Sequence, residues 1–144
     1  MIAPTDLALA RFNGEFNCAQ SVFAAFAPRF GIPEETALKL ASAFGGGFAR
    51  RGEVCGAVTG ALLVLGLASG VATKAGKLEA YRLAQEFMQR FEAKHATVIC
   101  RQLIACDLTT EEGRQQAAEK DVFTGVCTPL VCDAVEITHA LLKA

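Results

Sequence analysis

Six cysteines are the residues of this sequence best suited to do chemistry, because a thiolate is both a nucleophile and a metal ligand. They are Cys18, Cys55, Cys100, Cys106, Cys127 and Cys132. None of them forms a Cys-x-x-Cys pair, the compact arrangement for a dithiol site. A reactive pair would therefore have to be assembled from separate helices.

Three of the cysteines lie at or just before expected helix starts. Cys55 begins an expected helix over 55–70. Cys127 directly precedes a helix that Thr128 would cap, and Cys100 precedes a short helix. Free N–H groups and the positive end of the helix dipole lower the pKa of a thiol at such a position. We therefore expect Cys55 to be the reactive thiolate or the first ligand.

Cys18 falls inside an expected first helix over 5–29, beside a stripe of phenylalanines. The glycines of the segment 44–70 offer a way to bring it close to Cys55. Gly56 and Gly60 are four residues apart and would leave a groove on which another helix can lie. Glycines 45–47 would let the chain turn tightly. The alternative is that these small residues only permit tight packing and that the cysteines fill the core.

Apolar residues at helical spacing predict an all-α fold in which these cysteines are positioned. We expect one domain over residues 1–144, a compact bundle of about five to six helices around the central, glycine-rich helix 55–70. The segment 96–109 has features of both strand and helix. The other expected helices cover about 33–44, 77–95, 110–120 and the residues after 128.

Composition excludes some functions. The net charge of −1 gives no basic surface for nucleic acid. The apolar fraction of 52% and the mean hydropathy of +0.32 indicate helices buried on all sides or a homodimer, which we expect. The uncharged run 54–73 contains four glycines and favours a buried helix over a membrane span. The first residues lack a secretory signal, so we expect a cytoplasmic protein with few structural disulfides.

The glycine motif and the spaced cysteines together resemble a known family. Residues 55–60 read Cys-Gly-Ala-Val-Thr-Gly; Asn17-Cys18 precede them, and Cys100 and Cys127 follow. This pattern resembles the C_GCAxxG_C_C family, described as redox-active, over nearly the whole chain. The resemblance implies that Cys18, Cys55, Cys100 and Cys127 are the family's four cysteines. Cys106 and Cys132 are extra. It also implies a membrane transporter as a partner, because members often lie near transporter genes.

Two chemistries remain open for these four cysteines. In the first, thiols from separate helices exchange with a disulfide and pass electrons to an unidentified redox partner. In the second, the same four residues hold an iron–sulfur cluster or another metal; the resemblance allows this, although their spacing fits no ferredoxin pattern. Two Glu-x-x-His motifs, at 92–95 and 136–139, could hold di-iron, but Glu136 is expected to project away from the buried face. A third interpretation is a non-catalytic helical module that serves a transporter.

Overall fold

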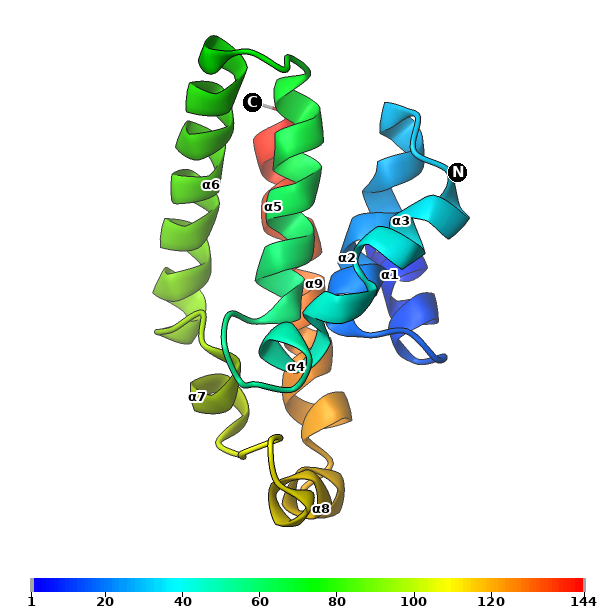
Figure 1. Ribbon diagram of the computed structural model, residues 1–144, viewed down its shortest axis with the longest axis vertical. Helices are drawn as coiled ribbons and strands as arrows, with labels where there is room; N and C mark the ends of the chain where they lie inside the picture. Colours follow the sequence, from blue (N-terminus) through cyan, green and yellow to red (C-terminus); the bar gives the residue numbers. More distant parts are fainter. Residues whose placement is uncertain (1, 144) are drawn as a thin grey trace.

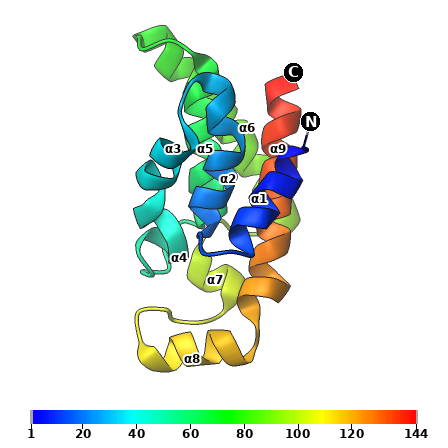
Figure 2. The same cartoon turned by 90° about the vertical axis from the view of Figure 1, so that its right-hand side faces the viewer.

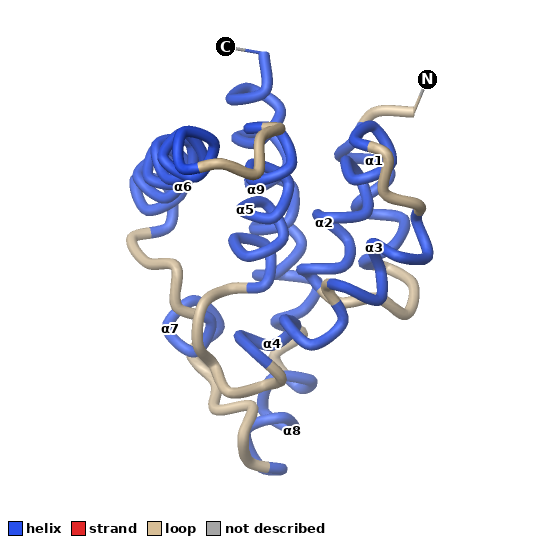
Figure 3. The backbone as a smooth tube through the Cα atoms, turned by 45° about the horizontal axis from the view of Figure 1, so that its top comes forward, coloured by secondary structure: helices blue, strands red, loops and turns tan. Residues whose placement is uncertain are grey.

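The computed structural model describes residues 2–143, and this part of the chain is all-α, as predicted (Figures 1 and 3). It contains more helices than the five or six expected. They are α1 (Pro4–Phe12), α2 (Cys18–Phe26), α3 (Glu34–Leu40), α4 (Gly45–Phe48), α5 (Gly56–Ser69), α6 (Lys74–His95), α7 (Cys100–Ile104), α8 (Glu111–Glu119) and α9 (Thr128–Lys143). The additional segments are short, and most of them lie at one end of the bundle, where α4, α7 and α8 gather below the long helices (Figure 1).

Helix α5 is the centre of the bundle and contacts α2, α6 and α9 (Figures 1 and 2). Its glycines set how closely α2 approaches. A Cβ atom added to Gly60 would lie only 2.7 Å from the carbonyl oxygen of Ala19, so the two backbones are nearly in contact there. This close approach, expected from the Gly56/Gly60 spacing, brings the start of α2 alongside the start of α5.

The expected first helix over 5–29 is wrong, because the chain breaks before Cys18. The Asn17 side chain accepts a hydrogen bond of 2.9 Å from the Gln20 N–H. The Gln20 side chain accepts one of 3.0 Å from the Asn17 N–H. This reciprocal pair is a capping box, which satisfies two free N–H groups and starts a new helix. Cys18 is therefore the first residue of α2 rather than a residue within a longer helix.

Helix α9 begins at Thr128, as expected, but Thr128 itself has a helical conformation and does not cap it. Residues Phe123–Cys127 form a wide π-helical turn that continues without interruption into α9. Such turns insert an extra residue into a helix and are frequent at functional sites. Cys127 therefore lies within a continuous helix and does not face a helix N-terminus.

This continuous helix, Phe123–Lys143, has the length and composition of a membrane span, with a mean hydropathy of 1.3. Within residues 2–143 it is the one helix that meets that description. The hydropathy value applies to an 18-residue window of this helix, and 44% of that window is buried inside the molecule. Helix α9 packs against α1, α5 and α6. A core helix of a folded domain has the same properties. The uncharged run 54–73 contains the shorter helix α5.

Candidate functional site

Four cysteines from four separate segments line one small enclosed cavity of about 30 Å³. They are Cys18, Cys55, Cys100 and Cys127. They come from the first turn of α2, the residue before α5, the first turn of α7 and the turn that leads into α9. Leucine, isoleucine and phenylalanine side chains complete the wall, so the thiols face one another in apolar surroundings.

Backbone pairing between residues 53–55 and 98–100 positions two of these cysteines. The Cys55 N–H donates to the Val98 carbonyl oxygen at 2.7 Å, and the Cys100 N–H donates to the Glu53 carbonyl oxygen at 2.7 Å. Between these bonds lies an isolated antiparallel bridge from Val54 to Ile99. The ambiguous segment 96–109 thus pairs briefly like a strand and then begins α7.

Two glycines leave the room that the thiols occupy. A Cβ atom on Gly56 would lie 3.2 Å from Cys18 Cβ and 3.1 Å from the Ala19 nitrogen. A Cβ atom on Gly47 would lie 2.7 Å from Cys100 Cβ and 2.6 Å from the Glu53 nitrogen. Larger residues at either position would displace a cysteine or the backbone that holds it.

The chain beside the cavity makes a left-handed turn. Five consecutive residues, 46–50, have φ between 52° and 68°. Gly46 and Gly47 adopt this conformation without a steric penalty. Phe48, Ala49 and Arg50 carry a cost of about 1–2 kcal/mol each. Backbone strain of this kind is concentrated at functional sites, where the surrounding structure holds it in place.

Cys127 has the largest influence on the pKa of Cys18, and Cys18 has the largest influence on the pKa of Cys127. The Cys18 side chain lowers the pKa of Cys127 below the ordinary value of 9.0, although burial acts in the opposite direction. The Cys127 side chain, followed by burial and the neighbouring thiols, raises the pKa of Cys18. Within this pair the thiolate is therefore favoured on Cys127 and the proton on Cys18.

Cys55 does not have the lowered pKa that its position before α5 predicts. Burial raises the pKa of Cys55 to about 11, because a thiolate loses its hydration there. The amide groups of Ala57 and Val58 act in the opposite direction but do not outweigh burial, and no hydrogen bond from α5 caps the sulfur. Burial, followed by the charges of Cys55 and Cys127, raises the pKa of Cys100 to about 12.

The remaining candidates lie outside the cavity. Cys106 is buried in the same apolar cluster as Cys100 and Cys127 but does not line the cavity. Cys132 is half-buried on α9, where burial and then Glu136 and Asp133 raise its pKa. The His95 Nε2 atom lies 2.8 Å from Asp133 Oδ2. Glu136 is exposed, as its position on the helix predicts. The Glu-x-x-His motifs therefore do not meet.

The four thiols are chemically suited to a soft metal or an iron–sulfur cluster. Their arrangement does not fit one. Among residues 2–143, no three Cys, His, Asp or Glu side chains are close enough together to hold a metal ion. All six cysteines are free thiols.

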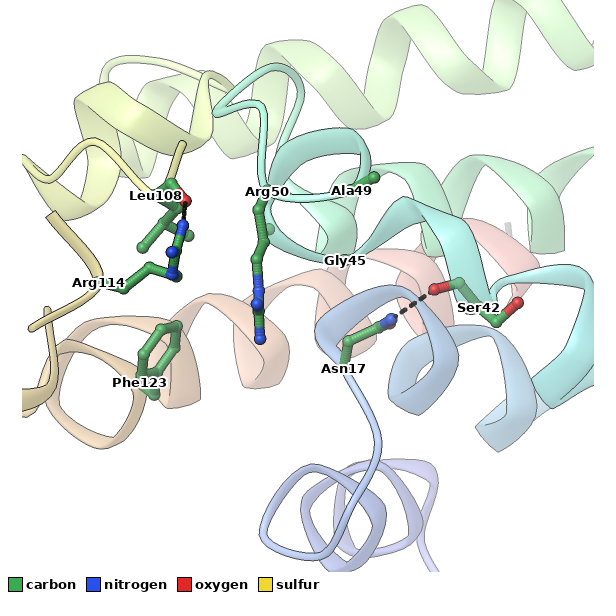
Figure 4. Close-up of a pocket in the computed structure, with 9 residues that line it drawn as sticks. Asn17, Ser42, Gly45, Ala49, Arg50, Leu108, Arg114 and Phe123 are labelled. Atoms are coloured by element: carbon green, nitrogen blue, oxygen red, sulfur yellow. Dashed lines mark hydrogen bonds between the residues drawn. The ribbon is translucent and has the colours of Figure 1, made fainter. Parts of the chain in front are cut away.

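A surface pocket of about 510 Å³ adjoins the cavity and contains residues that sequence reasoning did not assign to the site (Figure 4). Arg50, Arg114 and Phe123 are among them. Arg50 follows the glycine-rich turn, which was a signal available in the sequence. Arg114 had none, because α8 reads as an ordinary solvated helix.

Comparison with known proteins gives one assignment. Residues 16–141 match the model of the family described as "Putative redox-active protein (C_GCAxxG_C_C)". No curated protein and no solved structure matches the chain. The family match includes all four cysteines of the cavity and the glycine motif at 55–60. The chain therefore belongs to the C_GCAxxG_C_C family.

Proposed function

We propose that this protein carries electrons by thiol–disulfide exchange and that Cys18 and Cys127 are the exchanging pair. The observation that supports this most directly is that both thiols line the same small cavity, where the Cys18 side chain lowers the pKa of Cys127. Thiols from separate segments must converge in this way before a disulfide can link them. Exchange also requires a thiolate, and the Cys127 thiolate can generate one on Cys18 by accepting its proton.

Cys18 is the thiol that meets the substrate in this proposal. It is half-buried, whereas the other three cysteines of the cavity are buried. It also lines an outer pocket of about 340 Å³, together with Phe12, Phe16 and Phe123. A disulfide that enters this outer pocket therefore reaches Cys18 before any of the other three.

In the first step, Cys18 Sγ attacks one sulfur of the substrate disulfide. A Cys18–substrate sulfur–sulfur bond forms, the substrate disulfide breaks, and the first half leaves as a thiolate. The Cys127 thiolate accepts the proton of Cys18 during the attack and so acts as a general base.

In the second step, Cys127 resolves the mixed disulfide. The departing thiolate takes the proton from Cys127, and Cys127 Sγ then attacks Cys18 Sγ. The Cys18–Cys127 disulfide forms, and the second half of the substrate leaves as a thiolate that takes a proton from water. Two protein thiols are oxidised, and one substrate disulfide is reduced to two thiols.

Cys55 and Cys100 keep the site to a single thiolate. Because burial and then neighbouring thiols raise their pKa values to about 11 and about 12, both are protonated at neutral pH. A second buried thiolate beside Cys127 would be unfavourable without a cation to balance it. The negative charge therefore stays on the Cys18–Cys127 pair.

The test is to identify the disulfide that forms. Reduced protein is oxidised with a small disulfide, the remaining thiols are alkylated, and the cross-linked peptides are identified by mass spectrometry. We expect a Cys18–Cys127 linkage in the native protein and a trapped mixed disulfide on Cys18 in Cys127→Ser. Cys106→Ser is the matched control, because Cys106 is buried outside the cavity, and it should form the linkage normally.

Oxidation that never links Cys18 to Cys127 would refute the proposal. Iron and sulfide analysis of anaerobically purified protein addresses the metal alternative. If iron and sulfide are bound in stoichiometric amounts and lost in Cys18→Ser, a cluster replaces dithiol exchange as the function.

A further inference from the structure

A second site adjoins the thiols, in the surface pocket of about 510 Å³ shown in Figure 4. Its wall is formed by the N-cap of α2, the left-handed turn at residues 46–50, helix α8 and the turn that leads into α9. In Figure 4, the Arg50 side chain runs through the middle of this group, with Arg114 and Phe123 on one side and Asn17 on the other. A volume of this size is typical of sites for small molecules.

The charge of the pocket is positive. Arg50 and Arg114 line it, and no acidic side chain does. Within residues 2–143, neither guanidinium forms an ion pair with a carboxylate, although several other arginines of the chain do. Arg114 Nη1 donates to the Leu108 carbonyl oxygen at 2.9 Å, which orients the group and leaves its other N–H groups free. Two guanidinium groups without carboxylate partners favour an anionic ligand.

The pocket is continuous with the thiol site. Gly46, Leu108 and Phe123 line both this pocket and the cysteine cavity. Asn17, Gly46 and Phe123 also line the outer pocket that reaches Cys18. A molecule whose anionic group lies between the two arginines can therefore extend past Phe123 toward the Cys18 sulfur.

The backbone at Arg50 supports a functional role for this residue. Arg50 has φ of 67°, a conformation that an arginine rarely adopts, and its N–H donates to the Gly45 carbonyl oxygen at 3.2 Å. The strained turn places the exposed Arg50 side chain along the wall of this surface pocket (Figure 4).

We propose that Arg50 and Arg114 bind the carboxylate arm of a small anionic disulfide, whose sulfurs then react with Cys18. This inference rests on the proposed function and names its substrate class. The exchange is the one given above: the substrate disulfide is reduced to two carboxylate-bearing thiols, and Cys18 and Cys127 are oxidised to a disulfide.

Binding is tested without chemistry, using S-methylglutathione, an anionic thioether that cannot exchange with thiols. Calorimetry should show binding to the reduced native protein that weakens as salt is added. In Arg50→Gln/Arg114→Gln we expect affinity to fall about tenfold or more, because charge-assisted hydrogen bonds are lost. Arg51→Gln is the matched control, since it removes the same charge from the neighbouring position outside the pocket, and it should bind normally. Arg50→Gln alone provides a second variant at an exposed position in case the double variant is unstable.

Charge selectivity is tested in the exchange reaction, with glutathione disulfide as the anionic substrate and cystamine as the cationic one. The native protein should react faster with glutathione disulfide, and the double variant should lose this preference while its reaction with cystamine is unchanged or faster. Equal rates for the two disulfides in the native protein, or no detectable binding of the thioether, would overturn the inference and leave dithiol exchange intact. Binding of the thioether without exchange with either disulfide would overturn the proposed function.

Discussion

Replacing Gly47 with alanine would test whether the left-handed turn holds the thiol site together. Gly47 has φ of 68°, and its added Cβ would lie 2.6 Å from the Glu53 nitrogen and 2.7 Å from Cys100 Cβ. The conformational cost is about 1–2 kcal/mol. Overpacking against backbone adds about 1–3 kcal/mol. We expect the free energy of unfolding to fall by about 2–5 kcal/mol.

Two other glycines separate these contributions. Gly31 has φ of 84° and open space around its missing Cβ, so Gly31→Ala carries the conformational cost alone. Gly66 lies in α5, also with open space, so Gly66→Ala should be neutral or stabilising by about 0.5–1 kcal/mol. Urea unfolding followed by circular dichroism measures all three variants.

The clash at Gly47 also has a local consequence. Glu53 holds Cys100 through the bond from the Cys100 N–H to its carbonyl oxygen, so displacement of Glu53 should expose Cys100. The Cys100 thiol should then react faster with a disulfide reagent in Gly47→Ala than in Gly31→Ala. If Gly47→Ala is no less stable than Gly31→Ala and Cys100 stays unreactive, the account of the turn is wrong.

Three further predictions concern the site. Burial raises the pKa values of Cys55 and Cys100 above the ordinary 9.0, so folding favours their neutral form. The free energy of unfolding should therefore fall as pH rises from 9.0 toward 11. Urea unfolding at a series of pH values measures this decline, which should be shallower in Cys55→Ala. The Cys18 side chain lowers the pKa of Cys127, so alkylation of Cys127 should reach half its maximal rate below pH 9.0. This midpoint should shift to higher pH in Cys18→Ala, and an unchanged midpoint would contradict the interaction between the two thiols. Asn17→Ala removes the capping side chain of α2 and should cost about 1 kcal/mol of stability, measured by thermal unfolding. Disulfide exchange at Cys18 should also become slower. Full stability of this variant would show that the capping box is not formed.

The homodimer, the cytoplasmic location and the transporter partner stay predictions. The apolar composition suggests a homodimer. In agreement with this, α6 carries two large apolar side chains, Leu78 and Tyr81, that are more than half exposed. Light scattering of the purified protein measures the oligomeric state directly.

The bounds of a helix could be predicted best where clear sequence signals mark both of its ends. Helix α5 agrees with the expected 55–70 and α6 with the expected 77–95, each within a few residues. The break at Asn17 was missed, although the Asn-x-x-Gln capping pattern was present, because apolar residues continue at helical spacing on both sides of it. The same continuity hid the turn at Phe123–Cys127.

The sequence by itself determined the all-α class and the glycines that permit close backbone contact, because periodicity and residue size are properties of the chain. It also carried the motif whose resemblance to a known family implies the set of four cysteines. Only the tertiary structure decided which thiol is acidic. Helix starts predicted a thiolate at Cys55, but burial and neighbouring thiols depend on packing and raise its pKa to about 11. The preference for Cys127 arises from the side chain of Cys18, which lies 109 positions away in the sequence (127 − 18). The anionic-ligand pocket joins Arg50 and Arg114, which are 64 positions apart (114 − 50). Such contacts require the folded arrangement, since no local pattern records which distant side chains meet.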